Sequence, residues 1–350
     1  MNKKNLGQFY TTNYKYILDK LYIPVNVKNI IEPFSGKGDL IKFINKSSDK
    51  KYNIEEYDID PHTDESIQRD TLLDPPNYEN KFIITNPPYL ARNKSINKEI
   101  YNKYNQNDLY KCFIMSIISN SCIGGIIIIP VNFWCSIRKN DIELRRLFLE
   151  KYHIIRINIF EEKVFTDTSY SVCSFQFKKK IDDSINNINA VIYPIKKKIN
   201  FILDKTTNFI IGGEIYNLNS KNYKEKYKLE RLTKKNKDNK NKTNILIKCI
   251  DDNINNKIIA KIVDEKNIYI DNTPKLSARS YISIIINPYI NIEKQKILVS
   301  NFNKYLNNKR EKYNSLFLTN YRESNSIARK RISFKLVFEI IYYLLNSEIK

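Results

Sequence analysis

A predicted strand that ends in Asn-Pro-Pro-Tyr is the first feature of this sequence that could carry chemistry. The stretch FIITNPPYL covers residues 82–90, and four apolar or β-branched residues lead directly into Asn86. Proline lacks a backbone N–H and fixes φ, so Pro87 and Pro88 stop a central strand and stiffen the corner after it. The corner presents the Asn86 side chain and the Tyr89 ring in fixed directions, and by itself it is either a turn or a site.

A glycine-containing turn follows an earlier predicted strand. In EPFSGKG, Glu32 lies near the end of the strand at 29–34, and Gly36 and Gly38 open the turn after it. Glycines at such a place let a ligand approach the backbone. The spacing is not that of a Walker phosphate loop, and an ordinary strand-to-helix turn explains the stretch equally well.

Acidic residues follow at the end of the next predicted strand. YDIDP places Asp58 and Asp60 about 20 residues after the glycines, where an acidic side chain can accept both hydroxyls of a ribose. A solvated strand end would have the same residues. Asp70, in RDTLL, could accept the amino group of an adenine ring, or it could cap a turn.

The elements that must position these residues alternate between strand and helix patterns. Strands are predicted at 29–34, 52–60, 81–89, 124–130, 153–160 and 170–177, and helices at 35–44, 107–120 and 141–152. Such alternation predicts an α/β fold with a mostly parallel sheet covered by helices on both faces. In a sheet of this kind ligands bind at the carboxyl ends of the strands, which is where the polar residues above fall.

The pattern changes after about residue 195. Residues 234–244 are polar, highly charged and without periodicity, which predicts an exposed loop. Strand-like pieces occur at 244–250 and 281–290, and 331–345 has the pattern of a helix. We therefore predict one domain over residues 1–195 and a second, mixed α+β domain over residues 196–350.

The positive charge is concentrated in the second half. The chain has a net charge of +21, of which residues 1–180 contribute +6 and residues 181–350 contribute +15. A basic half of this kind indicates a polyanionic partner, nucleic acid first, although a lysine-rich solubilising surface would have the same charge. We expect no membrane partner, because no basic amphipathic helix stands out and no run reaches the ~20 apolar residues of a span.

The cysteines and histidines predict a reducing compartment and no metal site. The chain has five cysteines, an odd number without C-x-x-C spacing, and only two histidines. We expect buried, reduced thiols in the cytoplasm. The N-terminal residues MNKKNLGQFY lack the apolar segment of a secretory signal.

Together these motifs resemble the S-adenosylmethionine-dependent DNA adenine-N6 methyltransferases of type II restriction–modification systems. The order is the one called gamma, with the cofactor motifs first, the catalytic motif next and the target-recognition domain last. The resemblance covers about residues 5–180. It implies a Rossmann-like class I methyltransferase sheet over residues 1–195, a C-terminal target-recognition domain and S-adenosylmethionine as cofactor.

The resemblance also implies a role for each matching residue. GQFYTT resembles the N-terminal cofactor motif, although Thr12 replaces the usual proline. EPFSGKGDL matches the motif that cradles the methionine moiety, and YDIDP places Asp58 at the ribose and Ile59 against the adenine face. Asp70 matches the acceptor of the adenine amine. The implied cofactor-binding residues are Tyr10, Thr11, Glu32, Pro33, Gly36, Asp58, Ile59 and Asp70.

The NPPY corner is the implied catalytic motif, made of Asn86, Pro87, Pro88 and Tyr89. The Asn86 side-chain oxygen and the Pro87 carbonyl would accept the two hydrogens of the adenine amine, and this localises its lone pair for attack. Tyr89 and Phe165 would stack on the flipped base, although Phe165 could equally be a core aromatic. Candidate phosphate contacts in the second domain, which are as compatible with a solvated loop, are Lys234, Lys235, Lys237, Lys240 and Lys242.

The sequence therefore predicts a site-specific methyltransferase that flips an adenine out of duplex DNA. We expect a monomer on DNA, with any cognate restriction endonuclease acting separately. One alternative is an NPPY-type methyltransferase that acts on RNA or on a protein glutamine, since both acceptors are planar amines. Another is a DNA-binding subunit that keeps the fold without catalysis.

Overall fold

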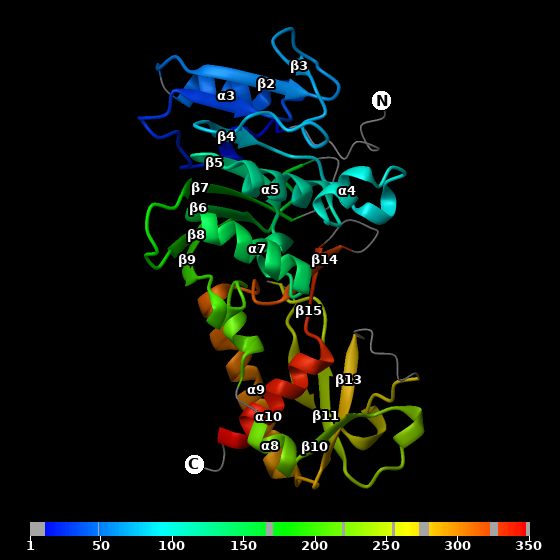
Figure 1. Ribbon diagram of the computed structural model, residues 1–350. Helices are drawn as coiled ribbons and strands as arrows, with labels where there is room; N and C mark the ends of the chain where they lie inside the picture. The colour runs from blue at the N-terminus through cyan, green and yellow to red at the C-terminus, as the bar shows by residue number, and fades with distance from the viewer. Residues whose placement is uncertain are drawn as a thin grey trace. The chain divides into compact units, whose positions relative to one another are not determined.

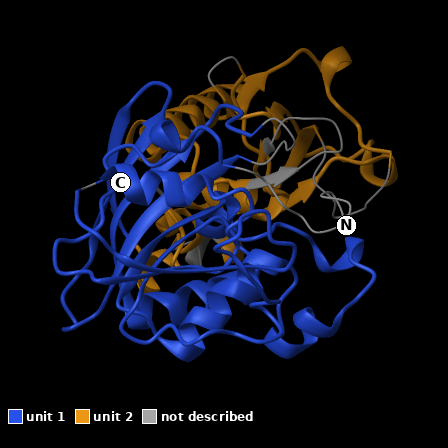
Figure 2. Cartoon of the chain, turned by 90° about the horizontal axis from the view of Figure 1, so that it is seen from above, with its two compact units in different colours: residues 1–202, 324–327 blue, residues 203–323, 328–350 orange. Residues whose placement is uncertain are grey.

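The computed structural model describes residues 11–47, 49–165, 171–218, 221–253, 256–272, 280–322 and 328–347. The chain divides into two compact units, one of residues 1–202 with 324–327 and the other of residues 203–323 with 328–350 (Figure 2). The last strand of the first unit lies beyond residue 195, where the sequence analysis places the end of the first domain, and it belongs to the same sheet.

The first unit is built on one nine-stranded sheet (Figure 1). Across the sheet the strands are β3 (Ile67–Gln68), β2 (Asn53–Asp58), β1 (Asn29–Glu32), β4 (Phe82–Thr85), β5 (Gly124–Pro130), β7 (Val172–Lys179), β6 (Tyr152–Phe160), β8 (Asn187–Tyr193) and β9 (Lys197–Ile202). The strands from β3 to β5 are parallel, β7 is antiparallel to both neighbours, β6 and β8 are parallel, and β9 is antiparallel to β8. The predicted α/β class with a mostly parallel sheet is confirmed.

The connections between these strands carry the helices. They are α2 (Tyr14–Ile17), α3 (Asp39–Ser47), α4 (Glu99–Tyr104), α5 (Leu109–Asn120), α6 (Asn132–Cys135) and α7 (Lys139–Lys151), with a 3₁₀ turn η1 (Arg92–Lys94). Helices α5 and α7 pack against each other (Figure 1). The helices predicted at 107–120 and 141–152 are confirmed, whereas α4, β8 and β9 were not predicted.

Strand β7 shows how the sheet is covered on both faces. Successive side chains of a strand point to opposite faces. Ser174 donates its hydroxyl hydrogen to the Ile17 carbonyl at the end of α2. Its neighbour Phe175 and the next residue on that face, Phe177, lie 5.9 and 5.2 Å, between ring centroids, from Phe148 of α7. One face of β7 therefore meets α2 and the other meets α7.

The second unit is a mixed α+β structure, as predicted. Its antiparallel sheet has the order β10 (Lys228–Arg231), β13 (Tyr281–Asn287), β11 (Lys242–Lys248) and β12 (Ile259–Ile262), and a hairpin pairs β14 (Thr319–Arg322) with β15 (Ala328–Arg331). Its helices are α8 (Lys221–Lys226), α9 (Ile292–Tyr313) and α10 (Phe334–Ser347). Helix α9 packs against β11, β12 and α10.

The prediction of a loop over residues 234–244 was wrong at the C-terminal end of this range. A 3₁₀ turn, η4, covers Lys234–Asn236, and β11 already begins at Lys242. The Lys242 ammonium lies 2.8 Å from a carboxylate oxygen of Glu265, so this charge is paired. The other four candidate lysines of the segment are exposed.

The cysteine prediction is confirmed in so far as all five thiols are free and buried. The apolar run from Phe113 to Cys135 is divided between α5, β5 and α6. In the part of the chain that the structure describes, no helix is long and apolar enough to cross a membrane.

Candidate active site

The NPPY corner lies where the strand order of the sheet reverses direction. Strand β1 pairs with β2 on one side and with β4 on the other, and ligands of open α/β sheets bind at such a switch point. Glu32 ends β1 and Asn86 follows β4. The two strand ends are joined directly, because the Thr85 hydroxyl donates to Oε1 of Glu32 over 2.5 Å.

Glu32 is a buried carboxyl with one unused oxygen. Its side chain is 1% exposed, and Oε1 also accepts from the Phe34 amide over 3.1 Å. Oε2 is buried and has no hydrogen-bond partner among the described residues. Burial is the main reason that the pKa of Glu32 is raised well above its usual range. An unpaired buried acceptor is costly, so a donor from a ligand, such as an ammonium group, would fit here.

Asp58 connects the acidic strand end to the glycine turn. Its Oδ2 accepts from the Gly36 amide over 2.8 Å and its Oδ1 from the Asp60 amide over 2.9 Å. Gly36 and Gly38 have φ values of +52° and +69°, which glycine adopts without steric cost. A carboxylate offers about four lone-pair directions, so an oxygen that accepts one amide hydrogen can also accept a second donor. Burial raises the pKa of Asp58.

The segment of Asp70 lies against the same turn. The Thr71 hydroxyl donates to the Pro33 carbonyl over 3.0 Å. Oδ1 of Asp70 accepts from the amides of Leu72 and Leu73, both over 3.0 Å, so Asp70 caps a turn. This is the structural alternative considered above, and recognition of an adenine amine by Asp70 stays a prediction.

The remaining expected cofactor residues lie nearby or outside the described residues. Ile59 follows β2 and is 37% exposed, which leaves part of its side chain available to a ring. Thr11 is buried, and its Oγ1 accepts from Nδ2 of Asn86 over 3.1 Å. The N-terminal motif therefore contacts the NPPY corner directly. Tyr10 lies outside the residues that the structure describes.

Tyr89 also contacts Asn86. Its hydroxyl oxygen lies 2.5 Å from Oδ1 of Asn86 and 2.9 Å from the carbonyl oxygen of Ile128. The Tyr89 ring is buried and meets the Tyr110 ring edge to face, with centroids 6.0 Å apart. Asn86 is thus held on one side by Tyr89 and on the other by Thr11, and these contacts orient its carboxamide before any substrate binds.

Phe165 lies in the connection between β6 and β7. Its side chain is 5% exposed. This burial agrees with a core aromatic, and it also agrees with the wall of a closed base pocket. The stacking role of Phe165 therefore stays a prediction.

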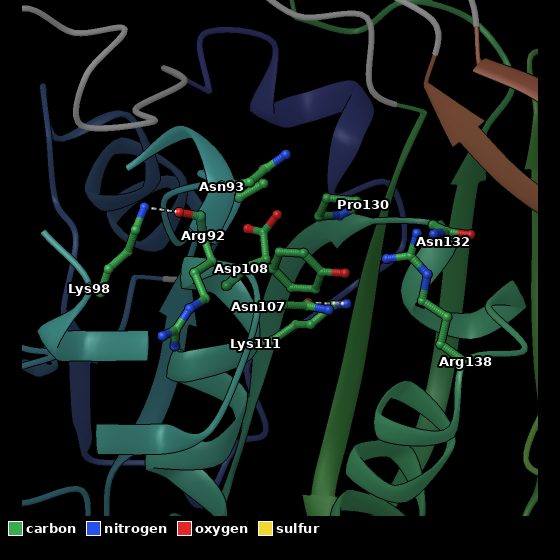
Figure 3. A pocket seen from close by; sticks show the side chains of 11 residues that line it. Arg92, Asn93, Lys98, Asn107, Asp108, Lys111, Pro130, Asn132 and Arg138 are labelled. Carbon is green, nitrogen blue, oxygen red and sulfur yellow. Dashed lines mark hydrogen bonds between the residues drawn. The ribbon is translucent and has the colours of Figure 1, made fainter. Parts of the chain in front are cut away.

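A cavity beside the NPPY corner was missed by the sequence analysis (Figure 3). It has a volume of about 500 Å³. Three segments line it, namely the stretch after Leu90, the start of α5, and the residues between β5 and α7. Its lining residues are Ala91, Arg92, Asn93, Lys98, Asn107, Asp108, Tyr110, Lys111, Pro130, Asn132 and Arg138. The basic stretch ARNKSINK after NPPYL is the one local signal that could have indicated it.

Asp108, in the wall of this cavity, is a buried carboxyl. Oδ1 of Asp108 is buried and has no hydrogen-bond partner among the described residues. Burial raises the pKa of Asp108 to about 7, although the charge of Lys111 opposes the shift.

Replacing Asp108 with Asn is expected to flatten the pH dependence of stability. With a pKa raised from its ordinary value near 4, the native Asp108 keeps a proton that the unfolded chain releases. Its contribution to stability is therefore present at low pH and is lost as the pH rises from about 4 to about 7. The effect is on the order of 2–4 kcal/mol, and urea unfolding of both proteins at pH 5.5 and pH 8 measures it.

Comparing wild type with Asp108→Asn isolates the contribution of Asp108 to the pH dependence of stability. Glu32 and Asp58 also have raised pKa values, but they are present in both proteins and contribute equally. Wild type should lose more stability than the variant between the two pH values. An identical loss in both proteins would show that Asp108 is ionised throughout.

Among the described residues, no group of three or more His, Cys, Asp or Glu side chains is placed to hold a metal ion. The polar groups at the switch point instead suit an organic ligand with an ammonium group and a ribose. Glu32 offers a buried acceptor, and Asp58 offers a carboxylate beside the glycine turn.

Comparison with known proteins agrees with this geometry. Residues 10–165 match the model of the family described as the Eco57I restriction-modification methylase. The resemblance to a restriction–modification methyltransferase is thereby confirmed for this part of the chain, and S-adenosylmethionine is the cofactor of such a domain. No curated protein sequence matches the chain.

Solved structures show a weaker similarity. The methyltransferase subunit of a type I restriction-modification system from Streptococcus thermophilus matches with 13% identity and a TM-score of 0.40, over 59% of this chain and 50% of that one. The type IIG restriction endonuclease BpuSI matches with 12% identity and a TM-score of 0.42, over 66% of this chain and 36% of that one. This chain thus spans half or less of the length of these structures. Scores of this size do not establish a shared fold, so the fold assignment rests on the strand order described above.

Proposed function

We propose that this chain, whose residues 10–165 match a restriction–modification methylase family, is a site-specific DNA adenine-N6 methyltransferase. The observation that carries the proposal is the Asn86 carboxamide at the switch point of the sheet. Thr11 and Tyr89 hold this carboxamide, and the buried Thr85–Glu32 bond joins it to the cofactor side.

The expected cofactor residues supply polar groups suited to S-adenosylmethionine. When bound, it supplies an electrophilic methyl group. Glu32 would accept from the ammonium of its methionine part, Asp58 would accept from the ribose hydroxyls, and Ile59 would cover one face of the adenine. Asp70 can contribute only through the oxygen that does not cap its own turn.

The corner would activate the amine of the target adenine. This amine is a poor nucleophile, because its lone pair is delocalised into the ring. Oδ1 of Asn86 and the Pro87 carbonyl accept its two hydrogens, which localises the lone pair and directs it. A carboxamide oxygen has two lone pairs, so it can accept from Tyr89 and from the amine together. Asn86 removes no proton itself, and the product cation loses its proton afterwards.

The target base would reach this corner by rotating out of the duplex, which costs a few kcal/mol. Stacking against Tyr89 and Phe165 would return roughly 1–3 kcal/mol per base. Because the Tyr89 ring is buried, a side-chain movement must precede stacking on it.

The second unit would recognise the DNA sequence. Residues 181–350 carry a net charge of +15, and lysines 234, 235, 237 and 240 are exposed. We propose that the boundary between the two domains lies near residues 195–202. We also propose that the protein binds duplex DNA as a monomer, and that a cognate restriction endonuclease, where one exists, is a separate protein. Five buried free thiols agree with a reducing, intracellular setting.

RNA and protein glutamine are the alternative substrates, because both present planar amines. The charge of the C-terminal half favours a nucleic acid over a protein. A chain that bound the cofactor without turnover on any substrate would instead be a non-catalytic subunit.

One assay tests the proposal. The protein is incubated with methyl-labelled S-adenosylmethionine and mixed-sequence duplex DNA, and the labelled nucleoside is identified after digestion. We expect N6-methyldeoxyadenosine. Label on cytosine, or label only in RNA or protein supplied in parallel, would refute the assignment of adenine in DNA.

A further inference from the structure

The cavity at the NPPY corner lies at the carboxyl ends of β4 and β5. One of its lining segments begins at Ala91, two residues after Tyr89. Pro130, at the end of β5, belongs to another lining segment. Strands β4 and β5 are parallel neighbours, so their carboxyl ends meet at one edge. A group bound in this cavity would therefore lie next to whatever Asn86 holds.

Four cationic side chains line the cavity, against the single carboxyl of Asp108. Lys111 is already neutralised, because its Nζ lies 2.6 Å from Oδ1 of the buried Asp141. Arg92 and Arg138 form no salt bridge with any residue in the described ranges. Among the described residues, the Lys98 ammonium donates to backbone carbonyls alone, those of Arg92 and Ser95. Three positive charges therefore surround the cavity without a carboxylate partner in the part of the chain that the structure describes.

The arrangement of these charges indicates an extended anion. In Figure 3, Arg92 and Lys98 lie on one side of the cavity, Asn132 and Arg138 lie on the other, and Asp108 lies between them. The Asp108 carboxyl, whose pKa is raised to about 7 by burial, carries only part of its charge near neutral pH. A volume of about 500 Å³ exceeds the space that one inorganic phosphate needs.

We propose that this cavity binds the sugar–phosphate backbone of the methylated DNA strand, at the nucleotide next to the flipped adenosine. The proposal rests on the proposed function. A base rotates out of the duplex about its own backbone, so the backbone beside it must be held while the base turns. Contacts to phosphates fix position without reading sequence, and arginine suits them because its planar fork of donors matches phosphate oxygens.

The salt dependence of DNA binding tests the proposal. The logarithm of the binding constant falls linearly with the logarithm of salt concentration, by about 0.9 per neutralised phosphate on duplex and about 0.7 on single strands. Arg92→Ala and Arg138→Ala are each expected to reduce this slope by about one contact, and the double variant by about two. Fluorescence anisotropy of a labelled mixed-sequence duplex measures the slope, and the unfolding temperature of each variant shows whether it folds.

Helix α7, which begins directly after Arg138, offers a matched control. Arg146 of α7 is paired with Glu143 and Glu150 at the surface, so Arg146→Ala should leave the slope unchanged. Arg138→Lys keeps the charge and should keep the slope. With the DNA concentration varied at saturating S-adenosylmethionine, the Arg92 and Arg138 variants should show a raised KM for DNA with little change in kcat, whereas a misfolded protein would lose kcat.

The outcomes of these experiments distinguish a failure of the cavity assignment from a failure of the proposed function. Wild-type protein that methylates DNA, with an unchanged slope in the double variant, would overturn the cavity assignment and leave the proposed function standing. Wild-type protein that neither binds nor methylates DNA would overturn both. Inorganic phosphate at constant ionic strength is the probe for a free anion. If it raised the unfolding temperature of wild type but not of the double variant, with no difference in DNA slope, the cavity would be a site for free phosphate instead.

Discussion

Asn86→Ala is expected to lower kcat/KM for methyl transfer about 100- to 1,000-fold. The estimate follows from other enzymes, in which removal of one preorganised hydrogen-bonding group at the reacting centre has this effect. Alanine cannot accept the amine hydrogen, and it also loses the contacts to Thr11 and Tyr89. Initial rates with labelled S-adenosylmethionine and the DNA identified by the labelling assay give the ratio.

Two controls separate catalysis from folding and cofactor binding. Titration calorimetry should give similar S-adenosylmethionine affinities for wild type and Asn86→Ala, because Glu32 and Asp58 are untouched. Tyr89→Phe keeps the ring and loses only the hydroxyl that touches Asn86, so we expect a reduction of about tenfold or less. Full activity of Asn86→Ala would place the reacting amine elsewhere.

Asp141→Ala is expected to destabilise the protein by about 3–5 kcal/mol, the usual cost of removing one partner of a buried ion pair. The side chains of Lys111 and Asp141 are 7% and 2% exposed, and their charged atoms lie 2.6 Å apart. Without Asp141 the Lys111 ammonium would remain buried between α5 and α7, with the Asn107 carboxamide as its remaining hydrogen-bond partner among the described residues. Urea unfolding at neutral pH measures the difference in free energy of unfolding.

The same helix offers a surface pair as the control. Glu143→Ala breaks an exposed ion pair with Arg146 and should cost no more than about 1 kcal/mol. The double variant Lys111→Met/Asp141→Leu removes both buried charges and should recover most of the lost stability, because apolar replacements of buried pairs are often neutral or stabilising. Equal effects of Asp141→Ala and Glu143→Ala would mean that water reaches the Lys111 ammonium.

Local patterns in the sequence were enough to predict six strands of the first unit, β1, β2 and β4 to β7. Fully apolar runs such as GGIIIIP at 124–130 become buried central strands, because a strand covered on both faces cannot expose polar side chains. The two prolines after Thr85 determine where β4 ends, and the acidic and glycine residues follow strand ends that meet at one edge.

Helix α9 was missed although its signals are local. Asn291 caps it through a 3.0 Å bond from the Lys294 amide, and buried apolar residues recur every four positions at Leu298, Phe302 and Leu306.

Only the tertiary structure decided how the site is held together. Thr11, one partner of Asn86, and Thr85, one partner of Glu32, lie 75 and 53 residues away in sequence, and no periodicity reports which side chains meet over such separations. Asp70 was assigned by its motif to a ligand, but its carboxylate is partly used by its own turn.

The cavity beside the NPPY corner depends on tertiary structure for the same reason. Three segments meet there, and apart from the basic stretch ARNKSINK none of them has a sequence that indicates a binding site. Whether a cation remains available depends on its partners in space. Lys111 is paired with a buried aspartate, whereas Arg138 forms no salt bridge with any described residue. Element type follows from hydrogen bonding and burial within a few residues of chain. The charge and shape of a site follow from contacts that form only when the sheet brings distant segments to one edge.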